Sequence, residues 1–276
     1  MNELSHTPII RDGKHFYFLS LFYAREKWSE LISEINNFQQ NSQIPFCDCL
    51  ICFSTEKGEH LQLTLITSSE ENRNFSDEIQ TFFQLYFERN PSISKTPFPY
   101  GKAVWCNYPN NSLAWNKFKM KDYSEQYLNF HKKTIDTALK LLIDDFSEDN
   151  FLSLGIYLIT KGLCYFDDNG QKDLLLQALK GASVSSPHLV FTTKELVNEI
   201  DINEIGMAIE FCRNDNPDDY SKELIIWLED AGNFLKFHSF NKFCTSICEI
   251  IGLKGLRQLM ILELLNKWFY YNLHYS

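Results

Sequence analysis

The sequence predicts an α+β protein: an N-terminal mixed or antiparallel sheet with helices, followed by a mostly helical second half packed with it as one unit. Residues 60–67 read HLQLTLIT, and this alternation has the period of two that is typical of a strand. After about residue 110, apolar residues recur every three or four positions, as on the buried face of a helix. The apolar share of 44% is ordinary for a globular chain and allows a sizeable core.

The first 108 residues are expected to alternate strands and helices. The segment 15–23, HFYFLSLFY, is apolar on both sides, which indicates a central strand. The strands are expected at 15–23, 46–53, 60–67 and 102–108, and the helices at 25–38 and 76–88. Lys57-Gly58 is expected to turn between the two middle strands, and the three prolines of 90–99 predict a loop. This order is typical of ferredoxin-like and related α+β layers.

Residues 111–276 are expected to form helices at 122–144, 149–161, 171–179, 193–212, 219–237, 242–251 and 255–271. Lys180-Gly181 is typical of a helix C-terminus, and Ser185-Ser186-Pro187 predicts a break. The stretch 193–212 fits either one helix or two that meet near Gly206. With no repeat or linker visible, we expect a single domain over 1–276, made of an α/β layer (1–110) and a helical part (111–276).

Composition excludes several classes of function. The formal net charge of −10 argues against a nucleic-acid partner, which requires a basic surface. No apolar run approaches the length of a membrane span, and the start lacks the basic and apolar regions of a signal peptide. A cytoplasmic location with reduced cysteines is therefore expected. Cys47, Cys49 and Cys52 lack the second ligand pair of a structural zinc site, so neither a metal nor a cofactor is expected.

The alternating strand 60–67 provides the candidate site. Its leucines point to one face, whereas His60, Gln62 and Thr64 point to the other. Two interpretations remain open, because such a polar row forms either a solvated sheet face or the floor of a binding cleft. Histidine suits proton transfer, since its ordinary pKa lies near working pH.

Further motifs follow the order of a known family. An aromatic strand, a Trp-bearing helix and an apolar strand precede the segment 58–65, GEHLQLTL. In this respect the chain resembles the C-terminal domain of lantibiotic dehydratases, which also occurs alone as the thiopeptide-type bacteriocin biosynthesis protein. That family usually reads His-Leu-Arg-Leu-Arg in this strand, so Gln62 and Thr64 stand where it has arginines. A later family motif with an arginine corresponds to 107–115, which keeps Tyr108 and Pro109 but lacks the arginine.

Near its end the family carries a histidine followed shortly by Asn-Arg. The chain has His238 followed by Asn241 and Lys242, which is similar but shifted by one position. The resemblance therefore implies catalytic roles for His60 and His238. It implies substrate binding by Gln62, Thr64 and Tyr108.

The resemblance implies maturation of ribosomally made peptide natural products. Family members eliminate glutamate from glutamylated Ser or Thr, or build the pyridine core of thiopeptides by cycloaddition of two dehydroamino acids. Elimination needs a base and positive charge for the departing carboxylates, and the arginines that would supply this charge are absent. Cycloaddition has no glutamate to hold. The implied partners are a precursor peptide with its leader and a larger glutamylating dehydratase subunit.

Two hypotheses follow. The chain is an enzyme, a lyase or cyclase acting on a modified precursor peptide, or a binding module that holds the leader peptide or a dehydratase partner, for instance by adding a strand at a sheet edge. Convergence of His60, Gln62, Thr64 and Tyr108 in one cleft would favour the enzyme. No arginine is expected close to His60. In an enzyme, His60→Ala should lower turnover about a hundredfold without changing the melting temperature.

Overall fold

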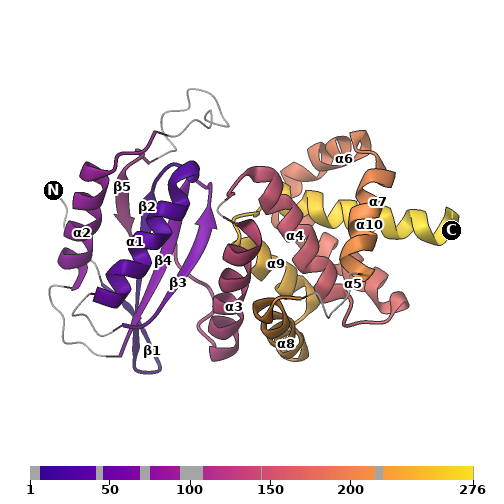
Figure 1. Cartoon of the computed structure of the whole chain (residues 1–276). Coiled ribbons are helices and arrows are strands. Elements are labelled where there is room, and N and C mark those ends of the chain that lie inside the picture. Colours follow the sequence, from indigo (N-terminus) through magenta and orange to yellow (C-terminus); the bar gives the residue numbers. More distant parts are fainter. Residues whose placement is uncertain are drawn as a thin grey trace. The chain divides into compact units, whose positions relative to one another are not determined.

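The computed structural model describes residues 7–41, 46–68, 75–93, 108–143, 145–214 and 220–275. It divides the chain into two compact units, each with its own core (Figure 1). Unit 1 contains Met1–Ser124 and Asp144–Ser147, and unit 2 contains Glu125–Ile143 and Glu148–Ser276. The boundary thus falls after Ser124 rather than near residue 110. Whether the two units act as a single domain stays a prediction.

Unit 1 is built on an antiparallel sheet. Its strands are β1 (Ile9–Arg11), β2 (Lys14–Phe22), β3 (Phe46–Ser54), β4 (His60–Thr67) and β5 (Ser112–Trp115). The order is β1-β2-β4-β3, and β5 pairs with the part of β2 that β1 leaves open. As predicted, β2 is central and buried along nearly its whole length. Every strand pairing in the described part of the chain is antiparallel.

Two helices cover the leucine face of the sheet. The short helix η1 (Arg25–Lys27) leads into α1 (Trp28–Asn41), and α2 (Phe75–Arg89) lies on the same side (Figure 1). Trp28 stacks on Phe53 with ring centroids 5.4 Å apart, and Phe75 contacts Tyr17 at 4.4 Å. Residues directly opposite in an antiparallel pair share a face, so these rings lie on the side of Leu61, Leu63 and Leu65.

The opposite face of the sheet is covered by the segment that follows β5. Its Tyr123 ring packs edge-on against Phe16, with centroids 5.0 Å apart, and its Phe118 ring lies 4.8 Å from His60. The polar row of β4 is therefore part of a buried layer. Its interpretation as a solvated sheet face is wrong, because His60 is 0% exposed and Thr64 is 7% exposed.

The turn between β3 and β4 is confirmed at Lys57-Gly58, where both residues have positive φ. The strand expected at 102–108 falls mostly outside the described residues, and Tyr108 belongs to no strand. The sequence missed the short strands β1 and β5. Only 90–93 of the expected proline loop is described, and it contains no helix or strand.

Unit 2 is helical, as predicted. Its helices are α3 (Glu125–Leu142), α4 (Glu148–Leu163), α5 (Asp168–Ser185), η2 (Pro187–Leu189), α6 (Val190–Glu199), α7 (Ile202–Asn214), α8 (Lys222–Phe237), α9 (Phe240–Ile250) and α10 (Leu256–Tyr275). The last helix, α10, packs against α4, α5, α6, α7 and α9. No helix within the described ranges is both long and apolar enough to cross a membrane.

Two boundaries in unit 2 differ from the prediction. Helix α5 does not stop at Gly181, because this glycine serves helix packing: a Cβ there would lie 2.6 Å from the Asn241 amide nitrogen. The stretch 193–212 is divided, but between Glu199 and Ile202 rather than near Gly206. Gly206 lies inside α7, where a Cβ would come 3.2 Å from the Trp268 ring. The predicted break at Ser185-Ser186-Pro187 is confirmed, with Pro187 starting η2.

Candidate functional site in unit 1

The predicted histidine lies inside a column of aromatic rings. His60 is 0% exposed, and its imidazole is flanked by Phe22 at 4.6 Å and Phe118 at 4.8 Å between ring centroids. Phe22 stacks in turn on Tyr108, 4.5 Å away and inclined by 25°. Tyr108, Phe22, His60 and Phe118 thus form a continuous series, here called the ring stack. Its two end rings are half-buried.

Both imidazole nitrogens of His60 have hydrogen-bond partners. Nδ1 lies 2.8 Å from the Gly58 carbonyl oxygen, which can only accept, so Nδ1 carries the hydrogen. Nε2 then accepts from the Gln62 side-chain amide at 3.2 Å. Burial lowers the pKa of His60 from 6.5 to about 4, although the bond to Gly58 favours the charged form. The expectation of a pKa near working pH is therefore wrong, and the ring is neutral at pH 7.

Local structure explains this placement. The register of β2 and β4 sets Phe22 directly opposite His60. The Lys57 carbonyl accepts a hydrogen bond from the Tyr108 backbone N–H at 2.9 Å, which fixes the outer ring of the stack. Gly58 has a φ of +114°, a conformation that residues with a side chain rarely adopt. The turn therefore positions the carbonyl that orients the imidazole.

The structure brings together most of the predicted site residues. Gln62 is half-buried and bonds His60, Tyr108 ends the ring stack, and Thr64 lies farther along the same sheet face. These contacts lie in a closed aromatic layer, and the convergence of all four residues in one cleft, which would favour the enzyme hypothesis, stays a prediction. The sequence did not identify Phe118, although lysines alternate with Phe118 and Met120 in its segment.

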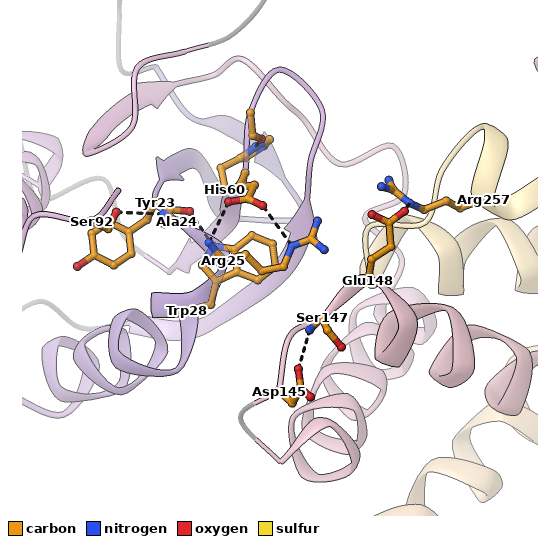
Figure 2. Close-up of polar contacts among 12 residues, drawn as sticks. Tyr23, Ala24, Arg25, Trp28, His60, Ser92, Asp145, Ser147, Glu148 and Arg257 are labelled. Carbon is orange, nitrogen blue, oxygen red and sulfur yellow. Dashed lines mark hydrogen bonds and ion pairs between the residues drawn. The ribbon is translucent and has the colours of Figure 1, made fainter. Parts of the chain in front are cut away.

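An arginine contacts Glu59, the residue before His60, whereas the expectation that no arginine lies close to His60 itself stays a prediction. Arg25 Nε lies 3.5 Å from the Glu59 carboxylate, and the Arg25 backbone N–H donates to the same carboxylate at 3.0 Å (Figure 2). The Glu59 carbonyl also accepts from Tyr23 at 3.1 Å. Successive side chains of a strand point to opposite faces, so Glu59 and its arginine lie on the helix-covered side, away from His60. Arg25 also lies over the Trp28 ring, 5.7 Å from its centroid.

A polar network fixes the end of β2 that carries Phe22. The Ala24 N–H donates to the Ser92 hydroxyl at 3.0 Å (Figure 2). The Tyr23 hydroxyl donates to the Asn90 carbonyl at 2.5 Å. Asn111 accepts from Ser92 and donates from its backbone N–H to the Phe22 carbonyl at 2.7 Å. These bonds connect the end of α2 and the start of β5 to the ring stack.

The second predicted histidine belongs to unit 2. His238 follows the last residue of α8, is half-buried, and lies 4.2 Å from the Phe234 ring between centroids. A joint role for His60 and His238 stays a prediction. Within the described ranges, no group of three or more His, Cys, Asp or Glu side chains could hold a metal ion. Cys244 and Cys248 are fully buried, and burial raises the pKa of both thiols.

No protein-family model matches the sequence, and no curated protein sequence matches it. Among solved structures, the pyridine synthase TbtD from thiomuracin biosynthesis has a similar fold, with a TM-score of 0.61. The similarity covers 93% of this chain and 98% of that chain, so it includes both units. Sequence identity is 9%, and the likeness therefore concerns the fold. The chain has the fold of a thiopeptide-biosynthesis protein over nearly its whole length.

Proposed function

We propose that this protein acts in the maturation of a ribosomally made peptide, as a cyclisation-type domain that joins two dehydroamino acids of a modified precursor. The observation that carries the proposal is the fold likeness to a pyridine synthase across 93% of the chain. A likeness of this extent is not explained by a shared sheet or a shared helix pair.

The chemistry of the polar row favours ring formation over glutamate elimination. Elimination releases glutamate, whose carboxylates call for cationic partners. Gln62 and Thr64 are neutral, and Arg25, which pairs with Glu59, lies on the helix-covered side of the sheet. Cycloaddition of two dehydroamino acids, one of which contributes its amide nitrogen to the ring, releases no glutamate and makes no such demand.

In this proposal His60 is a positioning residue. It is fully buried and neutral at pH 7, so it holds the Lys57-Gly58 turn and the Phe22 ring in place rather than exchanging a proton with substrate. Three of the predicted residues have side-chain surface available for a peptide, since each is half-buried: Gln62 and Tyr108 in unit 1 and His238 in unit 2. Substrate contact at each of these residues, taken unit by unit, is part of the proposal.

The burial of the polar row also supports a second candidate. A fold that has lost accessible acid–base groups can still hold the leader peptide or a dehydratase subunit. Peptide binding at a sheet edge needs backbone groups rather than charge. In this alternative the protein binds the precursor without changing it.

Two substrates distinguish these functions. The first is a precursor peptide from the same gene neighbourhood with two dehydroalanines, and the second is the same peptide with a glutamylated serine. Dehydroalanine adds thiols, so ring formation should reduce the number of thiol adducts per peptide by two, as read by mass spectrometry. Loss of glutamate from the second peptide would overturn the proposal in favour of elimination. Saturable binding without any change in either peptide would overturn it in favour of the binding module.

A further inference from the structure

The segment that covers the ring stack carries an exposed row of lysines. Residues 116–123 read NKFKMKDY, and exposure alternates along them. Phe118 and Met120 are half-buried, whereas Lys117, Lys119 and Lys121 are exposed. The inward ring of Phe118 packs on His60, so the lysines are held on a fixed part of unit 1.

The hairpin of β1 and β2 adds two more cations to this surface. The Asn116 side chain donates to the Thr7 carbonyl at 3.4 Å, which brings the segment beside the residues leading into β1. Burial raises the pKa of the Tyr123 hydroxyl, and the charge of Arg11 partly offsets this rise, so Arg11 lies within electrostatic reach of Tyr123. Lys14 pairs with Arg11 across the hairpin, and both are exposed.

The charge of this surface is opposite to that of the chain. The segments 7–14 and 116–123 contain five cations, Arg11, Lys14, Lys117, Lys119 and Lys121, against the acids Asp12 and Asp122. Asp122 accepts hydrogen bonds from the Ser124 N–H at 3.0 Å and from its hydroxyl at 2.7 Å. The whole chain has 36 acidic against 26 basic residues. A cationic surface on an acidic protein attracts a short anionic ligand locally.

We propose that the surface formed by 7–14 and 116–123, here called the lysine surface, binds an acidic segment of a peptide. A peptide segment fits better than a nucleic acid, because a long polyanion would extend beyond the lysine surface onto a chain of net charge −10. The inference is independent of the proposed ring formation, since an acidic peptide can bind whether or not the protein changes it.

The test uses fluorescence anisotropy with the full-length protein. The probe is a labelled 12-residue peptide in which Glu alternates with Ser, and its control has Gln in place of Glu. The test variant is Lys117→Glu with Lys119→Glu. The matched control is Lys180→Glu with Lys194→Glu, which makes the same charge change at exposed positions of unit 2. All four lysines are exposed, so melting temperatures should be unchanged.

The wild type should bind the Glu peptide, and affinity should fall as salt rises. The test variant should bind at least tenfold more weakly, whereas the control variant should bind like the wild type. Equal weakening in both variants would overturn the proposal, because net charge alone would then explain binding. Undetectable binding of the Glu peptide, or tighter binding of a single-stranded oligonucleotide with the same dependence on Lys117 and Lys119, would also overturn it.

Discussion

Replacing His60 with alanine tests whether the ring stack is structural. The substitution removes a fully buried ring from between Phe22 and Phe118 and leaves the Gly58 carbonyl and the Gln62 amide without their partner. A cavity of this kind with two unpaired polar groups should lower the free energy of unfolding by about 3 kcal/mol. This expectation replaces the prediction, made from sequence, that the melting temperature would not change.

His60→Phe is the matched variant, because it keeps an aromatic ring in the stack and removes only the hydrogen bonds. We expect His60→Phe to lower the free energy of unfolding by about 1–2 kcal/mol, clearly less than His60→Ala. Both variants are compared with the wild type by urea unfolding at pH 7, and activity is measured on the dehydroalanine peptide. If His60→Ala retains wild-type stability and loses turnover, His60 is an accessible catalytic group and the reasoning from burial is refuted.

The remaining predictions concern pH and packing. Folding lowers the pKa of His60 from 6.5 to about 4, so the unfolded chain binds more protons than the folded protein between these pH values. The free energy of unfolding of the wild type should therefore fall by about 3 kcal/mol as pH falls through this window. Paired urea titrations of His60→Phe should lack this loss. Phe146 is 5% exposed, and its ring lies 5.5 Å from the Phe53 ring. Phe146→Ala should lower the free energy of unfolding by about 3–5 kcal/mol, as read from the urea midpoint. Gly162→Ala should lower the melting temperature, because its Cβ would lie 2.2 Å from a carbon of the Phe243 ring; an unchanged midpoint would contradict this close packing of α4 on α9.

Elements with a clear period could be predicted from the sequence. The strand β4 alternates every two residues, β2 is a run that is apolar on both faces, and α3 and α8 repeat apolar positions every three or four. Such patterns extend over many residues, so the residues that the sequence places on the apolar face are those that the fold buries. The turn at Lys57-Gly58 could also be predicted, because a tight turn with positive φ favours glycine and so leaves a local mark in the sequence.

Features that depend on distant residues could not be predicted. Strands β1 and β5 have three and four residues, too few to show a period. Gly181 resembles a helix end in sequence, but Asn241 of another helix decides its role. Likewise, nothing in the alternation of β4 shows that Phe118 covers His60. The polar row was identified correctly, whereas its burial is a tertiary property.

This burial changes the meaning of the missing arginines. Thr64 is 7% exposed and lies between Phe18 of β2 and Leu50 of β3 on the same sheet face. An arginine at 64 would bring a charge into this layer, and burying a charge without a partner costs several kcal/mol. Gln62 is only half-buried, so an arginine there could extend toward solvent.

Introducing both arginines is the direct way to ask whether glutamate elimination can be restored. We expect Gln62→Arg with Thr64→Arg to lower the free energy of unfolding by more than about 3 kcal/mol without conferring glutamate elimination. Gln62→Arg alone should remain folded and serves as the control. A stable double variant that releases glutamate from a glutamylated peptide would show that the β4 face opens to substrate, and it would refute the view that this face is part of the core.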